Sequence, residues 1–355
     1  MRSTKTAIDR ISAWAIDLPM NRTFVSARSV LRTRRLVLVK LEAKGHVGWG
    51  EVAPVPGHSI EDFSAVWSGI QTAATELLAS HRISIEGPAA AAILQATADV
   101  AARAAGLPLS RHLGGHNDVW ASAAIGTDAE GHPDRDLLEQ VAAQGYRYAK
   151  LKITGATKTT WLRDIAADFP YITMGLDANG SLDLGDPSAL AALDGLGFAF
   201  IEQPGPAADL PGHRWLKETI ATPLSLDESA HSALAVEQIV DHGAADIINL
   251  KAGRFGTTET LALAQRVTAA GYQVRLGGLV ESGIGRSHNI ALAGRDEFSV
   301  VGDIAGSDVY FDNDLVDPPW RVVDGRLEPT DVPGIGVTVN EAAIERLAFD
   351  SFRRR

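Results

Sequence analysis

From about residue 119 onward, short runs of β-forming residues alternate with helix-length segments. The helix-length segments are amphipathic, and several close at a glycine, as at Gly145 and Gly271. Strand–helix units that repeat eight times in succession are typical of a (β/α)8 barrel, the TIM-like architecture of the α/β class. The eight runs are residues 121–126, 147–153, 171–177, 198–202, 223–227, 245–251, 273–278 and 298–302.

An open, doubly wound sheet is the alternative arrangement for this pattern. No Gly-x-Gly-x-x-Gly turn joins an early strand to a helix, so the sequence does not support dinucleotide binding. The chain has 355 residues, which suits a barrel of roughly 250 residues plus a smaller domain.

The segments on either side of the barrel predict a second domain. Residues 36–41 are typical of a strand and are followed by a turn at Lys44-Gly45, whereas residues 60–80 and 88–105 have helical patterns. We therefore predict an α+β capping domain over residues 1–118, the barrel over 119–318, and a C-terminal segment, 319–355, that returns to the capping domain and completes it.

Composition narrows the function classes. The chain has no cysteine, which excludes disulfides, zinc–thiolate sites and cysteine nucleophiles. Its formal net charge of −11 disfavours nucleic acid or an anionic membrane as a partner. The first 20 residues contain no uninterrupted apolar core, and no later stretch is apolar enough to span a membrane. We expect a cytoplasmic enzyme.

Polar residues stand at the ends of five consecutive predicted strands. The carboxyl ends of barrel strands form the active site, and these residues follow one another at intervals of roughly one strand–helix unit. The motifs are Lys150-Leu151-Lys152, Asp177-Ala178-Asn179, Glu202-Gln203-Pro204, Asp227-Glu228-Ser229 and Asn249-Leu250-Lys251.

Three of these residues predict a metal site. Asp177, Glu202 and Asp227 end adjacent strands at one level, so their carboxylates should converge and repel one another unless a cation joins them. Hard oxygen ligands without His or Cys favour Mg²⁺, or Mn²⁺ in its place.

The lysines predict the chemistry. Lys152 and Lys251 belong to strands four apart in the barrel, so they should face each other across a bound substrate. Lys150 points to the same face as Lys152. A metal and an ammonium group would stabilise the enediolate formed when a proton leaves the carbon next to a carboxylate. A lone Lys-x-Lys pair is usually a solvated face and a lone Asp after a strand is often a helix N-cap. Five such motifs at regular spacing, however, favour the catalytic interpretation.

These strand-end motifs resemble those of the enolase superfamily, in particular its muconate lactonizing enzyme subgroup. A lysine base with Mg²⁺ is the known chemistry of that superfamily. Further matching motifs are Gly48-Trp49-Gly50-Glu51, Ala98-Asp99-Val100-Ala101, Gly106-Leu107-Pro108-Leu109 and Leu113-Gly114-Gly115.

Within the subgroup, residues 277–286 and the following His288-Asn289 look most like o-succinylbenzoate synthases and N-succinylamino acid racemases. Gly302-Asp303 with Ser307-Asp308 also fits that group. The resemblance implies a homo-oligomer that acts on a small carboxylate bearing a succinyl or other N-acyl arm. It also implies substrate contacts from Lys150, Asn179, Leu279, Val280, Glu281, Ser282 and Phe24, under a cap formed by residues 19–29 and 53–58.

The sequence departs from the family pattern at Gly256-Thr257-Thr258, where a Gly-Gly pair is expected. The capping loop expected over residues 19–29 has no close match either, and since that loop helps to choose the substrate in this family, the sequence does not identify the substrate. Dehydration to o-succinylbenzoate and racemisation begin with the same proton abstraction, so the sequence does not separate them.

Several rival functions remain. Muconate-type cycloisomerisation is the nearest, since it shares the lysines and the metal. A dipeptide epimerase is less favoured because Ile304-Ala305 follows Asp303 in place of an Asp-x-Asp motif. Mandelate racemase-type chemistry would need a His where Gly277-Gly278 stands. A binding protein without activity would not need both lysines and all three carboxylates.

Overall fold

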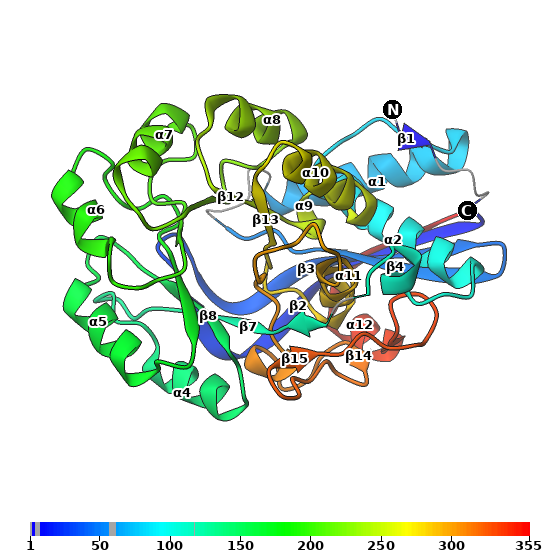
Figure 1. Ribbon diagram of the computed structural model, residues 1–355. Helices are drawn as coiled ribbons and strands as arrows, with labels where there is room; N and C mark the ends of the chain where they lie inside the picture. The colour runs from blue at the N-terminus through cyan, green and yellow to red at the C-terminus, as the bar shows by residue number, and fades with distance from the viewer. Residues whose placement is uncertain (1, 4–7, 57–61, 117) are drawn as a thin grey trace.

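The computed structural model describes residues 2–3, 8–56, 62–116 and 118–355. It contains an antiparallel sheet with its helices and a larger parallel sheet surrounded by helices (Figure 1). None of the helices in the described ranges is long and apolar enough to cross a membrane.

The cap is built on a four-stranded antiparallel sheet in the order β17-β2-β3-β4. Its strands are β2 (Arg10–Val25), β3 (Val30–Ala43), β4 (His46–Val52) and β17 (Ala348–Arg354). Helices α1 (Phe63–Ser80) and α2 (Pro88–Ala104) complete this layer. Two glycines let the alanine-rich α2 lie directly on β4. A Cβ at Gly48 would stand 2.1 Å from the carbonyl oxygen of Ala96, and one at Gly50 would stand 2.0 Å from that of Ala92.

Seven parallel strands form the larger sheet, in the order β13-β12-β11-β10-β9-β8-β7. Successive strands along the chain are neighbours in space, which is the topology predicted from the sequence. The strands are β7 (Ser122–Ile125), β8 (Tyr148–Lys152), β9 (Thr173–Asp177), β10 (Ile201–Glu202), β11 (Leu224–Leu226), β12 (Ile247–Leu250) and β13 (Gln273–Leu276). The helices between and after them are α4 (Arg135–Ala143), α5 (Thr159–Asp168), α6 (Pro187–Leu193), α7 (Leu210–Thr219), α8 (Ala233–His242), α9 (Ala252–Phe255), α10 (Thr257–Ala269) and α11 (Gly283–Ala293).

The eighth predicted strand, residues 298–302, is not a regular strand. It forms one isolated parallel bridge, between Val300 and Arg275. The bonds around it are scattered over both edges of the sheet: Asp303 N–H donates to the Leu276 carbonyl at 2.9 Å, and Ser122 N–H donates to the Ile304 carbonyl at 3.0 Å. Residues 298–304 thus contact β13 and, through Ile304, β7 at separate points without a continuous ladder, and the expected eight-stranded sheet is observed as seven strands.

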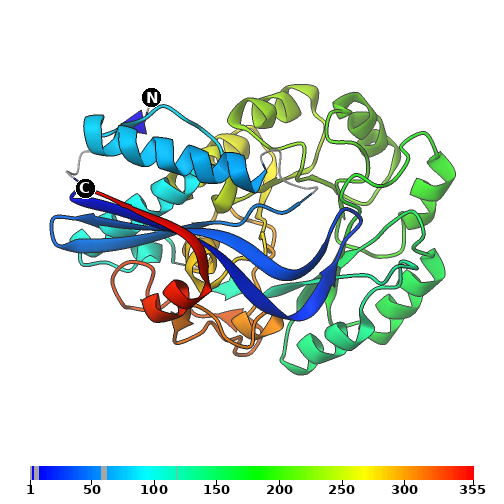
Figure 2. The same ribbon diagram turned by 180° about the vertical axis from the view of Figure 1, so that it is seen from behind.

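The cap reaches over the carboxyl ends of the parallel strands. Residues 19–29 were expected to be a loop, but β2 continues through them to Val25, with a register break after Pro19. The long β2–β3 hairpin crosses to the barrel (Figure 2). Its turn is fixed there, because the Arg28 side chain donates to the Asn179 carbonyl at 2.5 Å and Thr127 N–H donates to the Val25 carbonyl at 3.2 Å. Of residues 53–58, the last two lie outside the described residues.

The end of the chain lies on the cap. Helix α12 (Glu341–Leu347) is followed by β17, which pairs antiparallel with β2. Short pairs accompany these elements: β1 (Arg2–Ser3) with β5 (Arg82–Ile83), β6 (Val119–Trp120) with β15 (Arg326–Leu327), and β14 (Val316–Asp317) with β16 (Thr338–Val339). Helix α3 (Leu109–His112) and the 3-10 helix η1 (Ser307–Val309) lie in the connecting segments.

Candidate active site

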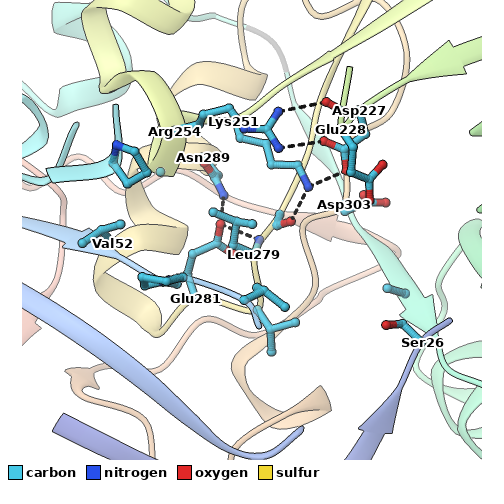
Figure 3. Close-up of a pocket in the computed structure, with 18 of the residues that line it drawn as sticks. Ser26, Val52, Asp227, Glu228, Lys251, Arg254, Leu279, Glu281, Asn289 and Asp303 are labelled. Atoms are coloured by element: carbon cyan, nitrogen blue, oxygen red, sulfur yellow. Dashed lines mark hydrogen bonds and ion pairs between the residues drawn. The ribbon is translucent and has the colours of Figure 1, made fainter. Parts of the chain in front are cut away.

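A cavity of about 480 Å³ lies between the cap and the carboxyl ends of the parallel strands. Both lysines of the predicted pair, Lys152 and Lys251, line it. The cap contributes an apolar wall of Phe24, Leu31, Val52 and Val55. Figure 3 shows Val52 on the side of the cap and Asp227 and Lys251 on the side of the barrel.

Strand register brings the three predicted carboxylates to one edge. Glu202 on β10 lies opposite Asp177 on β9 and opposite Ser225 on β11. Asp227 comes two residues after Ser225, directly beyond the end of β11, and its side chain points to the same face. Asp177 and Glu202 have no exposed surface, and Asp227 is 3% exposed. Buried carboxylates at this density need positive partners.

Lys150 supplies the first of these partners. Its Nζ lies 2.9 Å from an Asp177 carboxylate oxygen and 2.6 Å from Asp303, and it also donates to Glu202. Arg275 pairs with the other Glu202 oxygen and lies 2.8 Å from Asp303. Two cations therefore connect three acids in a closed network, in which Asp303 keeps the largest exposure, at 8% of its side chain.

The two predicted catalytic lysines contact different carboxylates. Lys152 Nζ lies 2.6 Å from Asp177 and donates to the Asn179 side-chain oxygen at 3.0 Å. Lys251 Nζ lies 2.7 Å from Asp227 and donates to the Gly278 carbonyl at 3.2 Å (Figure 3). Lys152 is the last residue of β8 and Lys251 directly follows β12, and three other strands separate these two. Each lysine therefore enters the cavity from its own part of the sheet.

Burial and charge shift the pKa values of this cluster in different directions. Burial by itself raises the pKa of Asp177, but the ammonium groups of Lys150 and Lys152 outweigh it and hold that pKa well below the ordinary value. Asp227 behaves in the same way: burial opposes ionisation, and Lys251 and Arg254 reverse the effect and lower its pKa. In Glu202 burial prevails over Lys150 and Arg275 and raises the pKa to about 7.

The predicted substrate contacts lie around this cavity with one exception. Lys150, Asn179, Phe24, Leu279, Val280 and Glu281 line it. Ser282 is turned away instead: its hydroxyl donates to Glu51 of the cap at 2.5 Å, and its N–H donates to the same carboxylate at 2.9 Å.

The sequence predicted no role for Arg275 or Arg254, and it marked Asp303 only as part of a family motif. Arg254 donates to Asp227 at 3.2 Å from the helix that follows Lys251. Arg275 carried a usable signal, since a charged residue between Val274 and Leu276 inside an apolar strand run requires a buried acidic partner.

A second acidic cluster lies away from the cavity. Among the described residues, only Asp128, Glu130 and His132 have ligand atoms that all lie within 4.8 Å of one another. All three are exposed, and His132 is already hydrogen-bonded to Asp128 and packs at a tilt against the Trp161 ring. The predicted carboxylates of the strand ends are not so close, because the Lys150 ammonium lies between Asp177 and Glu202.

Comparison with known proteins agrees with this geometry. The family model described as "Enolase C-terminal domain-like" matches residues 134–343, and "MenC, N-terminal domain" matches residues 8–97. The first of these covers more than half of the chain. The protein belongs to the enolase superfamily.

Relatives that match nearly the whole chain show the same family over both the cap and the barrel. The o-succinylbenzoate synthase of Geobacillus kaustophilus is 32% identical, over 93% of each chain. The N-succinylamino acid racemase of Thermus thermophilus is 29% identical, over 94% of this chain and 95% of the relative. The crystal structure of an enolase-superfamily member from Listeria innocua has a TM-score of 0.89 and 28% identity, over 98% of this chain and 99% of that one. The chain is thus an enzyme of this superfamily, related to both a synthase and a racemase.

Proposed function

We propose that this enzyme removes the proton from the carbon next to a substrate carboxylate, through an enediolate, and acts as an o-succinylbenzoate synthase, an N-succinylamino acid racemase or both. One observation carries the proposal. Two buried lysines enter one cavity from strands that three others separate, and each is paired with a different carboxylate. Such a pair can remove a proton from one side of a carbon and deliver one from another side.

The donor set at the strand ends fits a hard divalent cation. Asp177, Glu202 and Asp227 offer only carboxylate oxygens, the ligands that Mg²⁺ or Mn²⁺ prefers, and no His or Cys stands among them. We assign these three residues as the metal ligands. The bound metal would supply positive charge to the carboxylate oxygens of the substrate.

The remaining steps belong to side chains of the chain itself. Lys152 and Lys251 hold or receive the moving proton at Nζ. Lys150, tied to three carboxylates, keeps its charge and adds to the positive potential around the enediolate oxygens, since those acids outweigh the burial that would lower its pKa. The cap covers the strand ends and would exclude water from a bound substrate, which strengthens these interactions.

The cap and the loop after β13 would hold the acyl arm. Phe24 presents an apolar surface, while Leu279, Val280 and Glu281 line the same cavity. We assign these residues and Asn179 as substrate contacts, and expect Ser282 to act from outside the cavity. We further propose that residues 298–304 close the barrel as an irregular eighth strand, and that the enzyme is a cytoplasmic homo-oligomer.

The structure disfavours the dipeptide epimerase alternative. Recognition of a substrate ammonium would need a free carboxylate beyond β13, but both oxygens of Asp303 are already bonded to Lys150 and Arg275. Muconate-type cycloisomerisation uses the same lysines and metal. Only the substrate that the enzyme accepts distinguishes it from the proposed function.

The test is NMR in D₂O with a pure enantiomer of an N-succinylamino acid, in parallel with an assay for o-succinylbenzoate formation. We expect metal-dependent deuterium uptake at the α-carbon or dehydration to o-succinylbenzoate. A protein that binds these compounds without exchange or dehydration, yet lactonizes muconate, would refute the proposal in favour of its rival.

A further inference from the structure

The loop that carries the predicted acyl-arm contacts is held by the cap. Arg34 on β3 is 1% exposed and donates four hydrogen bonds, all to backbone carbonyls. Two go to the cap itself, at Ala53 and Pro54, over 2.9 and 3.2 Å. The other two cross to the barrel, at Leu279 and Val280, over 3.0 and 3.2 Å. One guanidinium thus fixes the two walls of the cavity to each other.

Glu51 on β4 makes a second connection beside the first. It is 1% exposed and accepts three hydrogen bonds from the barrel. Ser282 donates its N–H at 2.9 Å and its hydroxyl at 2.5 Å, and Gly285 donates its N–H at 3.0 Å. These groups belong to the start of α11, directly after the cavity-lining loop. A helix N-terminus leaves N–H groups without partners of their own, and here a carboxylate from the other domain accepts from one of them.

The loop between these two connections has a backbone conformation that needs support. Val280 has a φ of 56°, a left-handed value that is costly for a β-branched residue. Its carbonyl and that of Leu279 are the two that Arg34 binds. Neither Arg34 nor Glu51 lines the cavity, whereas Leu279, Val280 and Glu281 do.

We infer that Arg34 and Glu51 are positioning residues for substrate specificity: they hold residues 279–282 in register with the cap, so that the cap shapes the acyl pocket from both sides. Neither catalytic lysine is bonded to Arg34 or Glu51, and Lys251 donates to the Gly278 carbonyl, one residue before the held segment. Loosening the clamp should therefore change which acyl arm fits more than it changes proton abstraction itself. This inference rests on the proposed function only for its kinetic readout.

The kinetic experiment compares N-succinyl and N-acetyl derivatives of one amino acid. The readout is the ratio of their kcat/KM values, which does not depend on how much of a sample is folded. We expect Glu51→Gln and Arg34→Lys to shift this ratio by about five-fold, the factor that one ordinary hydrogen bond represents. Ser282→Ala removes only one of the three bonds to Glu51 and should shift it in the same direction by less.

Asp99 provides the matched control. It is also a fully buried carboxylate with three bonds, from Trp49 N–H at 2.9 Å, Ile335 N–H at 2.8 Å and the Arg103 side chain at 3.0 Å. None of these partners belongs to the pocket loop. Asp99→Asn should lower the melting temperature and leave the ratio at the wild-type value.

Hydrogen–deuterium exchange of the peptide spanning residues 278–285 gives a readout without turnover. We expect faster exchange there in Glu51→Gln and Arg34→Lys than in Asp99→Asn. Unchanged exchange and an unchanged ratio in the first two variants would overturn the inference, as would an equal ratio shift in Asp99→Asn. Should the wild type act on neither substrate, the racemase part of the proposed function fails, and the function fails as a whole if no o-succinylbenzoate forms either. In both cases the exchange comparison still decides the positioning role.

Discussion

The two walls of the cavity differ in kind. The barrel wall is a network of ion pairs in which Lys150 alone joins three carboxylates. The hairpin wall of the cap is mostly apolar, with Phe24 and Leu31 each 6% exposed. Charges fixed by several partners cost little to reorganise during a reaction, which suits chemistry. An apolar wall selects by shape. The difference indicates that reactivity resides in the barrel and substrate choice in the cap and the loop it holds.

Removal of the metal should have the largest effect among the tests of this division between a reactive barrel and a selective cap. Because the barrel wall gathers the carboxylates, a chelator should abolish turnover and added Mg²⁺ should restore it. Asp227→Asn should weaken Mg²⁺ affinity by roughly ten-fold or more, measured by calorimetry. The exposed cluster offers a control, since Asp128→Asn should leave that affinity unchanged. Full turnover in metal-free protein would contradict the claim that the carboxylates of the barrel wall hold a metal needed for the reaction.

A second prediction concerns the stability of the barrel wall. Arg275 is buried and pairs with Glu202 and Asp303, so Arg275→Met leaves two buried acids short of a partner. We expect it to lower the free energy of unfolding by about 3–5 kcal/mol, measured by urea denaturation. The matched change is Arg266→Met, whose pair with Glu237 is exposed and should contribute at most about 1 kcal/mol. Similar losses of unfolding free energy in the two variants would show that the buried network contributes no more to stability than an exposed ion pair.

Where the two walls meet, stability should depend on pH through Glu51. Burial raises the pKa of Glu51 from 4.5 to about 7, against the lowering effect of its bonds from Ser282. The folded state then binds a proton more tightly than the unfolded state. The contribution of Glu51 to the free energy of unfolding is therefore full below about pH 4.5 and is lost as the pH rises to about 7.

The measurement is the difference in unfolding free energy between wild type and Glu51→Gln. It should fall by up to about 3 kcal/mol from pH 4.5 to pH 7. Glu202 has a raised pKa in both proteins, so its effect cancels in the difference. A difference that does not vary over this range would contradict the shift.

The smallest effect is expected at the apolar wall itself. Phe24 packs edge-on against Tyr310 at the cavity, with 6.2 Å between ring centroids. Phe24→Leu removes part of this surface and should raise KM for an N-acylated substrate by roughly four-fold, with a smaller change in kcat. Val30, 60% exposed at the hairpin tip, provides the control, and Val30→Ala should leave KM unchanged. A kcat loss without a KM change in Phe24→Leu would place Phe24 in the chemistry.

The barrel wall could be predicted from the sequence because its information is local and periodic. Parallel strands end at one edge, so motifs such as Lys150-Leu151-Lys152 and Asp177-Ala178-Asn179 at unit spacing must meet there. The partners of Arg275 could not be predicted, since its charge shows only that an acid is needed, and tertiary packing decides which one.

The cap and its connections were less predictable. Nothing in the local pattern of residues 19–29 distinguishes an extended hairpin from a loop. The bonds between Glu51 and Ser282 join residues 231 positions apart, and so Ser282, which was expected to contact the substrate, donates its N–H and its hydroxyl to the cap instead. Residues 298–302 have a β-type composition, but the hydrogen bonds of this segment and of the two residues after it are divided between β13 and β7.

The central claim is that Lys152 and Lys251 act on different sides of one carbon. The direct measurement is α-proton exchange in D₂O, by NMR, for each pure enantiomer of an N-succinylamino acid with Lys152→Ala and Lys251→Ala. We predict that both variants lose racemisation, that Lys251→Ala still exchanges the enantiomer whose proton faces Lys152, and that Lys152→Ala still exchanges the other. Equal loss of exchange for both enantiomers in both variants would contradict the account.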